Sequence, residues 1–440
     1  MITVGCTHGV RMKYEENCGR AQHGTIRNHF FDISILLSAA EKSDTESVSY
    51  MKEDSDMKCL RDTVIRIDLD AVSRNIRNIR ALVGKDVAVA AVVKANAYGH
   101  GLTEIVPTLM ESGVSMLAAA TLGEALAIRE AYPDQDYPIL IMGLTPDRCL
   151  SDIIPHHLIQ TVDSFHQAEI LDRLAAAAGV RAKIHIKVDT GFHRIGFPSD
   201  DAGIREMLRL KELRSLDIDG IYTHLALLDD ETNREQNERF THVLGILQQN
   251  GFSFRCIHMA DSIALVDYPE YRYSMVRAGA LIYGLRGFHK GYADVRQALT
   301  FETKICHIST LRAGEGVSYD YTWRAPADGT RIATLPFGYA DGYPRNLRDK
   351  GYVLIRGHQC PLVGVLCMDQ CMADITGLPE AAIGDTVIIY GDGSDGAPDI
   401  QKISELAGTN KNEIAARLGA RPDRIYKKNG GWIYSDGTAV

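Results

Sequence analysis

Lys94 is the residue of this chain whose position most clearly suggests chemistry. It lies in segment 92–101, which reads VVKANAYGHG, directly after an apolar run at 87–93. A run of this length predicts a buried parallel strand, and α/β folds place reactive groups at the carboxyl ends of such strands. Partial burial lowers the pKa of an ammonium group, and the neutral amine can condense with a carbonyl group. The alternative is a structural lysine whose charged end extends from the strand into solvent.

Further polar side chains follow later predicted strands. Barrel enzymes gather such residues at one mouth, so the set predicts an active site even though each member alone is more often structural. Ser262 and the backbone amides around Gly279 could cradle a phosphate, because small side chains allow an anion to approach closely. The strand-end residues are Lys187, Arg194, His224, Ser262 and Arg277.

The elements that must position these residues alternate between strand-like and helix-like segments. The first predicted helix carries Val72, Ile76, Ile79 and Leu82 on one face, with Asp68 or Asp70 as its cap. About eight strand–helix units predict a closed (β/α)8 barrel. An open doubly wound sheet is less favoured, because no Gly-x-Gly-x-x-Gly turn follows an early strand. The strands are expected at 87–93, 115–120, 139–142, 158–162, 184–188, 217–222, 254–258 and 273–277.

The chain divides into three predicted parts. Residues 1–57 are polar and show no clear period, which predicts a disordered or loosely packed extension. Met51 and Met57 are alternative starts of translation. Residues 58–295 form the barrel. Residues 296–440 form a C-terminal β domain, because short β-rich runs such as 331–335 and 352–355 alternate with Gly, Asp and Pro turns.

Composition excludes several classes of function. With 440 residues, 45% hydrophobic and 24% charged, the chain predicts a soluble protein with a large interior, and no segment suggests a membrane span. A net charge of -9 without a basic tract argues against nucleic acid. Nine cysteines without a paired motif predict free thiols in a reducing, cytoplasmic compartment. Cys367 and Cys371 lack accompanying ligands, so no metal site is predicted.

Six segments resemble the motif series of bacterial alanine racemases and occur in family order between about residues 64 and 426. The resemblance implies an isomerase that interconverts L- and D-alanine with pyridoxal 5'-phosphate. Its expected role is the supply of D-alanine for peptidoglycan precursors, with catabolism and antibiotic resistance as the alternatives. It also implies a head-to-tail homodimer whose two active sites each use residues of both chains. The segments are 93–101, 189–194 (DTGFHR), 222–224 (YTH), 275–279 (MVRAG), 338–343 (GYADGY) and 367–370 (CMDQ).

The resemblance also implies roles for individual residues. Lys94 and Tyr319 of the partner subunit match the two bases that racemisation needs, one on each face of the α-carbon. Arg194 and the backbone of Met368 match groups that orient the substrate carboxylate. Lys187 matches a lysine that many family members carbamylate, with a bound anion such as chloride as the alternative, and Tyr339 matches the narrow entrance. The cofactor-binding residues implied are Lys94, Tyr98, His224, Ser262, Arg277, Gly279 and Ala280.

Two positions depart from the family pattern. Asn412 stands where many members carry a tyrosine, which leaves space and a hydrogen-bonding group for a serine hydroxymethyl, so a serine/alanine racemase is an alternative. Asp261 stands where asparagine is usual, which places a charge near the phosphate. A non-catalytic pyridoxal-phosphate carrier is a second alternative, but such proteins lack the β domain. A decarboxylase would need an acidic residue where Arg277 stands.

Overall fold

The computed structural model describes residues 59–434, so the predicted extension 1–57 and its alternative starts lie outside the described residues. Its first large unit is a closed barrel of parallel strands, in the order β5-β4-β3-β2-β10-β9-β8-β6, which the pairing of β5 with β6 closes. The predicted (β/α)8 barrel is therefore confirmed. The strands are β2 (Ala88–Val92), β3 (Met116–Ala119), β4 (Ile139–Ile141), β5 (Ile159–Val162), β6 (Ala182–Asp189), β8 (Leu216–Tyr222), β9 (Cys256–His258) and β10 (Met275–Ala278).

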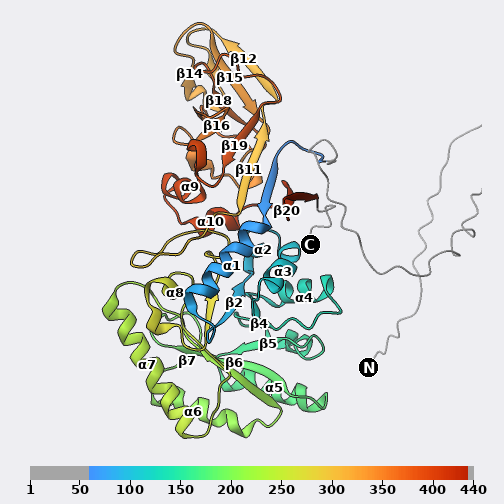
Figure 1. The fold of residues 1–440 in the computed structure, drawn as a ribbon, viewed down its shortest axis with the longest axis vertical. Coiled ribbons are helices and arrows are strands. Elements are labelled where there is room, and N and C mark those ends of the chain that lie inside the picture. Colours follow the sequence, from blue (N-terminus) through green and yellow to red (C-terminus); the bar gives the residue numbers. More distant parts are fainter. Residues whose placement is uncertain (1–58, 435–440) are drawn as a thin grey trace, which may run out of the picture. The chain divides into compact units, whose positions relative to one another are not determined.

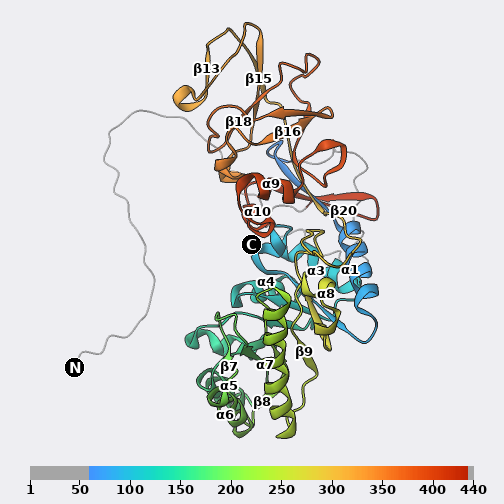
Figure 2. The same cartoon turned by 90° about the vertical axis from the view of Figure 1, so that its left-hand side faces the viewer.

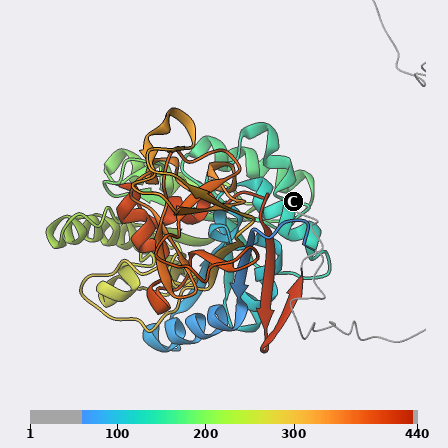
Figure 3. The same cartoon turned by 90° about the horizontal axis from the view of Figure 1, so that it is seen from above.

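Helices cover the outside of the barrel (Figures 1 and 2). The predicted first helix is α1 (Leu69–Val83), and the Asp68 side chain caps it by accepting the Ala71 N–H. Val72, Ile76 and Ile79 are fully buried, as their spacing predicts. Viewed from above, blue and green helices lie at the periphery, and orange and red segments cover the centre of the view (Figure 3). The others are α3 (Leu102–Glu111), α4 (Leu122–Ala131), α5 (Phe165–Ala177), α6 (Asp201–Arg209), α7 (Asp230–Gln249) and the short α8 (Ala264–Asp267).

The C-terminal domain is built on a seven-stranded sheet in the order β17-β16-β19-β11-β1-β20-β21. Smaller sheets join β12-β15-β18 and β13-β14, as the predicted β-rich pattern required. The strands are β11 (Leu299–Lys304), β12 (His307–Leu311), β13 (Gly316–Val317), β14 (Trp323–Arg324), β15 (Thr330–Leu335), β16 (Tyr352–Ile355), β17 (His358–Pro361), β18 (Cys371–Asp374), β19 (Thr386–Tyr390), β20 (Asp423–Lys428) and β21 (Gly431–Tyr434); the helices are α9 (Ile400–Ala407) and α10 (Lys411–Ala416).

The strand β1 (Val64–Asp68) belongs to this C-terminal sheet, although it falls in the range 58–295 that the sequence assigns to the barrel. It pairs antiparallel with β11 and parallel with β20. Its neighbour β20 also reaches the turn after Lys94, because the Arg424 guanidinium donates to the Gly99 carbonyl at 2.9 Å. The C-terminal domain thus supports the segment that carries Lys94. The boundary near residue 295 stays a prediction.

No helix between residues 59 and 434 has the length and apolar character needed to cross a lipid bilayer. The cysteines from Cys149 to Cys371 are free thiols. The cytoplasmic location stays a prediction.

Candidate active site

Lys94 begins an unusual turn at the carboxyl end of β2. In the element α2 (Lys94–Tyr98), the four residues Ala95–Tyr98 have φ between 52° and 54°, which is a left-handed conformation. For residues other than glycine this costs about 1–2 kcal/mol each. The Glu124 carboxylate holds the turn by accepting the Ala95 N–H at 2.7 Å. Backbone strain of this kind is concentrated at functional sites.

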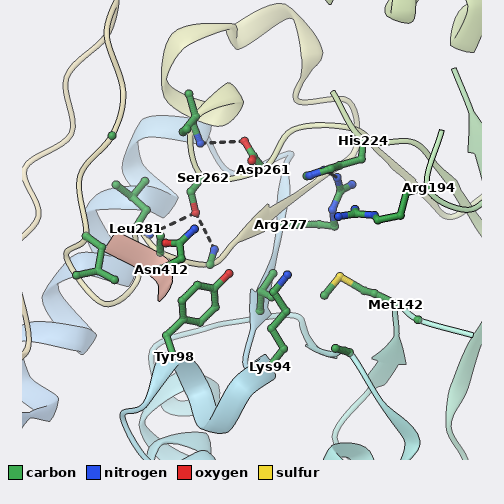
Figure 4. A pocket seen from close by; sticks show the side chains of 18 of the residues that line it. Lys94, Tyr98, Met142, Arg194, His224, Asp261, Ser262, Arg277, Leu281 and Asn412 are labelled. Atoms are coloured by element: carbon green, nitrogen blue, oxygen red, sulfur yellow. Dashed lines mark hydrogen bonds between the residues drawn. The ribbon is translucent and has the colours of Figure 1, made fainter. Parts of the chain in front are cut away.

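Most of the predicted site residues line one cavity of about 490 Å³ at the mouth of the barrel. Figure 4 shows Lys94 and Tyr98 rising side by side from α2, with Ser262 beyond the Tyr98 hydroxyl and Arg277, His224 and Arg194 grouped apart from it. The cavity therefore has a hydroxyl pole, formed by Tyr98 and Ser262, and a cationic pole around Arg277, His224 and Arg194. Lys94 lies between the two poles. The predicted residues that line it are Lys94, Tyr98, Lys187, Arg194, His224, Ser262, Arg277, Gly279, Ala280 and Asn412.

The hydroxyl pole has the chemistry of an anion site. Ser262 Oγ accepts the N–H groups of Gly279 at 2.8 Å and Leu281 at 3.3 Å. A Cβ at Gly279 would lie 2.7 Å from Tyr98 Oη, so only glycine lets this backbone approach the tyrosine. The Ala280 N–H has no acceptor within residues 59–434. Hydroxyls and a free amide in this arrangement suit a phosphate.

The Asp261 carboxylate, which departs from the family pattern, is occupied by the backbone. Its Oδ1 accepts the N–H groups of Ile263 at 2.9 Å and Ala264 at 3.0 Å, at the start of α8. These amides partly compensate the charge, as at other helix N-termini. The charge therefore adds less repulsion toward an anion at Ser262 than the sequence alone suggests.

Arg277 dominates the cationic pole and is only 4% exposed. Its Nη2 donates to the carbonyls of Met259 at 2.8 Å and Thr223 at 3.0 Å, and to His224 Nδ1 at 3.1 Å. Its Nη1 donates to His258 Nδ1 at 3.0 Å. Within residues 59–434 the Nε–H and the second N–H of Nη1 have no acceptor, so both are left for a ligand. Burial lowers the pKa of the guanidinium.

Lys94 and Lys187, two of the lysines that line the cavity, are shifted toward the neutral amine. Burial, and then the charge of Arg194, lowers the pKa of Lys94. Burial, and then the charge of Arg277, lowers the pKa of Lys187 to about 7. Lys187 is 3% exposed, and its Nζ donates to the Val188 carbonyl at 2.6 Å. Neutral amines are nucleophiles and bases, so the cavity can support both kinds of chemistry.

Three predicted site residues do not line this cavity in the same chain. Tyr319 is 65% exposed, Met368 53% and Tyr339 38%, and all three lie on loops of the C-terminal domain. Tyr319 lines a different hollow of about 570 Å³, together with Ser318 and Cys367. Within one chain, therefore, Lys94 and Tyr319 line different hollows.

Two polar side chains that line the cavity, Tyr222 and Lys411, were not predicted from the sequence. Tyr222 lies with its ring 4.5 Å from that of His258 and nearly parallel to it, and the Arg277 guanidinium is 5.3 Å from the Tyr222 ring. Its position at the end of β8, two residues before His224, was a usable signal. Lys411 of α10 also lines the cavity, and burial lowers its pKa. No sequence pattern separates it from a surface lysine.

The fold and this cavity together define a lysine-centred (β/α)8-barrel enzyme with an anion-binding pole. Two family models extend that conclusion: one described as alanine racemase, N-terminal domain, matches residues 67–287, and one described as alanine racemase, C-terminal domain, matches residues 298–426. The chain belongs to the alanine racemase family.

Individual proteins agree with this assignment. The chain is 39% identical to the alanine racemase of Desulforamulus reducens over 82% of its own length and 97% of the relative, and 36% identical to that of Clostridium tetani over 85% and 97%. The structure of alanine racemase from Clostridium difficile 630 superposes with a TM-score of 0.81 at 32% identity, covering 86% of this chain and 98% of that one. The Bacillus anthracis enzyme with bound L-Ala-P gives a TM-score of 0.78 at 31% identity, over 86% and 98%.

Proposed function

We propose that this protein is an alanine racemase that uses pyridoxal 5'-phosphate and interconverts L- and D-alanine by two bases. The observation that carries the proposal is the position of Lys94 between the anion pole at Ser262 and the buried cation of Arg277, in one cavity. Neither a carrier protein nor a serine-directed enzyme is favoured by the family assignment.

The residues of the cavity fit the proposed cofactor. Lys94 Nζ would hold its carbonyl carbon, and the hydroxyls of Tyr98 and Ser262 with the amides of Gly279 and Ala280 would hold its phosphate. When bound, pyridoxal phosphate supplies an electron sink that makes the α-proton of an amino acid acidic. The free Nε–H of Arg277 matches the ring nitrogen, to which a guanidinium donates a hydrogen bond without giving up its proton.

The proposed division of labour between two bases follows from stereochemistry. A proton removed and returned on one face regenerates the starting enantiomer, so a base is needed on each face. Lys94 Nζ would move the proton on one face, and Tyr319 of the partner subunit on the other. Arg194 would pair with the substrate carboxylate. Each positioned base contributes about 10²–10⁴ in rate.

The exposure of the C-terminal loops supports a homodimer with shared sites. Tyr319 and Met368 are large apolar or aromatic side chains that lie more than half exposed, away from the cavity of their own chain. The Tyr319 loop also has positive φ at Ser318, Asp320 and Tyr321, a strained geometry that an interface can hold in place. Docking of this loop against the barrel mouth of a second chain would complete the site.

Lys187 is proposed to be carbamylated, and the expected signature depends on pH. Carbon dioxide reacts only with the neutral amine. Because the folded protein lowers the pKa of Lys187 to about 7, the carbamate should form as pH rises through that value. With 13C-bicarbonate, we expect a carbamate NMR signal near pH 8 that weakens toward pH 6. The Lys187→Ala variant should lack this signal, and a wild-type spectrum without it would contradict the proposal.

Exchange in deuterated water tests the proposed function. The purified protein with pyridoxal phosphate should convert L-alanine into D-alanine that carries deuterium at the α-carbon. L-serine tests whether Asn412, which lines the cavity, admits a hydroxymethyl group. If Asn412 sets this preference, Asn412→Tyr should lower the ratio of serine to alanine turnover. Bound cofactor without D-product or α-exchange would contradict the racemase and favour a carrier.

A further inference from the structure

A continuous file of polar side chains runs through the barrel from Arg277 to the surface. Arg277 Nη1 and His258 Nδ1 are 3.0 Å apart, and His258 Nε2 lies 3.0 Å from His185 Nδ1. His185 Nε2 lies 3.3 Å from Asp219 Oδ2. Arg255 completes the file by donating to both oxygens of Asp219 at 2.8 Å. Of these residues only Arg277 lines the cavity, and the Arg255 side chain is 63% exposed.

The chemistry of the two ends fixes the direction of every hydrogen bond between them. A guanidinium can only donate, so His258 Nδ1 must carry a lone pair and its proton must be on Nε2. His258 then donates to His185 Nδ1, which leaves the His185 proton on Nε2. His185 therefore donates to the carboxylate of Asp219, which can only accept. Both imidazoles are held neutral in one tautomer.

The charge balance agrees with this direction. Burial, and then the charge of Arg277, holds the pKa of His258 well below its ordinary value, and burial lowers that of His185. Burial alone would raise the pKa of Asp219, but hydrogen bonds from His185 and Arg255 keep it below the usual range. The file thus has a permanent cation at the cavity, a permanent anion at the far end, and two neutral rings between them.

The backbone makes room for this file. His185 of β6 lies opposite Gly220 of β8, and a Cβ at Gly220 would lie 2.7 Å from the imidazole Nε2 and Cε1 atoms. Any larger residue would displace the ring from Asp219. The Tyr222 ring lies 4.5 Å from that of His258 at an interplanar angle of 5°, which restrains the second ring. The two rings are therefore fixed by packing as well as by hydrogen bonds.

A metal site is the competing interpretation of this cluster. One ligand atom from each of His185, Asp219 and Cys256 falls within 4.8 Å of the others. However, Arg255 already donates to both oxygens of Asp219, and His185 donates to one of them. A guanidinium and an imidazole N–H satisfy this carboxylate, and a divalent cation would add charge beside Arg255. The hydrogen-bonded file accounts for the cluster without a metal.

We propose that Asp219 and His185 are positioning residues that act on Arg277 through His258 and fix the direction of its hydrogen bonds in the cavity. The role of Arg277 opposite the cofactor ring rests on the proposed function. The direction of the hydrogen bonds between Arg277 and Asp219 does not rest on the proposed function, because it follows from the side chains alone. Asp219 and His185 are not catalytic residues, since neither touches the cavity.

The first test compares Asp219→Asn with Asp217→Asn. Asp217 is the matched control, because it lies two residues earlier on β8 and its loss removes the same charge near Arg255. Asp219 accepts three hydrogen bonds on its two oxygens, two from Arg255 and one from His185. Asparagine replaces one of these oxygens with an NH2 group, which would face a donor of Arg255 or His185 and cannot accept from it. We expect Asp219→Asn to lower kcat/KM by about ten- to a hundredfold, the usual weight of a hydrogen bond to a charged group. The loss should fall on kcat, with a changed visible spectrum of the bound cofactor.

A second pair keeps the test valid if Asp219→Asn does not fold. His185→Gln can accept from His258 and donate to Asp219, whereas His185→Leu can do neither. The glutamine variant should therefore retain more kcat and a spectrum closer to wild type than the leucine variant. Equal losses in the two His185 variants, or equal behaviour of the Asp219 and Asp217 variants, would overturn the proposal.

A third readout does not depend on activity. In protein labelled with 15N-histidine, with resonances assigned through His185→Gln and His258→Gln, both rings should be neutral with the proton on Nε2. A proton on Nδ1 of His258 would overturn the file even in an active racemase. If the protein shows the predicted tautomers but no racemase activity, the result would contradict the proposed function. It would still support the hydrogen-bonded file from Arg277 to Asp219.

Discussion

Lys94→Ala is expected to lower the rate of alanine racemisation by at least about 10⁴-fold, because one change removes both the amine that would hold the cofactor and one of the two bases. The amine is prepared for both roles: it begins the strained left-handed turn of α2, and burial with the charge of Arg194 lowers its pKa. The measurement is the initial rate of D-alanine formation from L-alanine at saturating pyridoxal phosphate.

Two further lysine variants make this result specific. Lys94→Arg keeps the positive charge but cannot condense with a carbonyl group, so it should be as inactive as the alanine variant. Lys85→Ala removes an exposed lysine outside the cavity and should leave the rate unchanged. Racemisation by Lys94→Ala within tenfold of wild type would contradict the assignment of this residue.

Tyr319→Phe is expected to lower racemisation by about 10²–10⁴-fold, since it removes one base and keeps the aromatic ring. The loss of α-proton exchange should affect only one of the two enantiomers of alanine. Lys94 still serves one face, so one enantiomer of alanine should exchange its α-proton with deuterated water without changing configuration. The other enantiomer should exchange much more slowly. Equal slow exchange of both enantiomers would mean that Tyr319 is not a base.

Mixed dimers test where Tyr319 acts. It does not line the cavity that contains Lys94 of the same chain, and we propose that the two bases of a working site come from different subunits. Refolding Lys94→Ala together with Tyr319→Phe should give heterodimers with one intact site, and random pairing should restore about a quarter of the wild-type activity. No recovery in verified heterodimers would place both bases in one chain.

Local patterns in the sequence were enough to predict the barrel. The apolar run at 87–93 became β2, and the face made by Val72, Ile76 and Ile79 became the buried side of α1. Lys94 could be recognised because the end of a parallel strand fixes where the next side chain lies. The strand-end residues His224 and Ser262 met it in the cavity for the same reason.

Features that depend on long-range contacts could not be predicted. The left-handed turn at Ala95–Tyr98 contains no glycine that would indicate this conformation in the sequence. It is held by Glu124, which is 29 residues away from Ala95. The strand β1 reads as part of the barrel until its pairing with β20 places it in the other domain. His185 and His258 are 73 residues apart and become partners only when the barrel closes.

Reduction of the holoenzyme with borohydride, followed by peptide mass spectrometry, tests the central claim most directly. A carbonyl cofactor held by an amine would be fixed irreversibly to the residue that carries it. We predict a phosphopyridoxyl group on the peptide that contains Lys94, and an unmodified peptide in the Lys94→Arg variant treated in the same way. A label on Lys187, on Lys411 or on no lysine at all would contradict the assignment of Lys94 as the centre of this site.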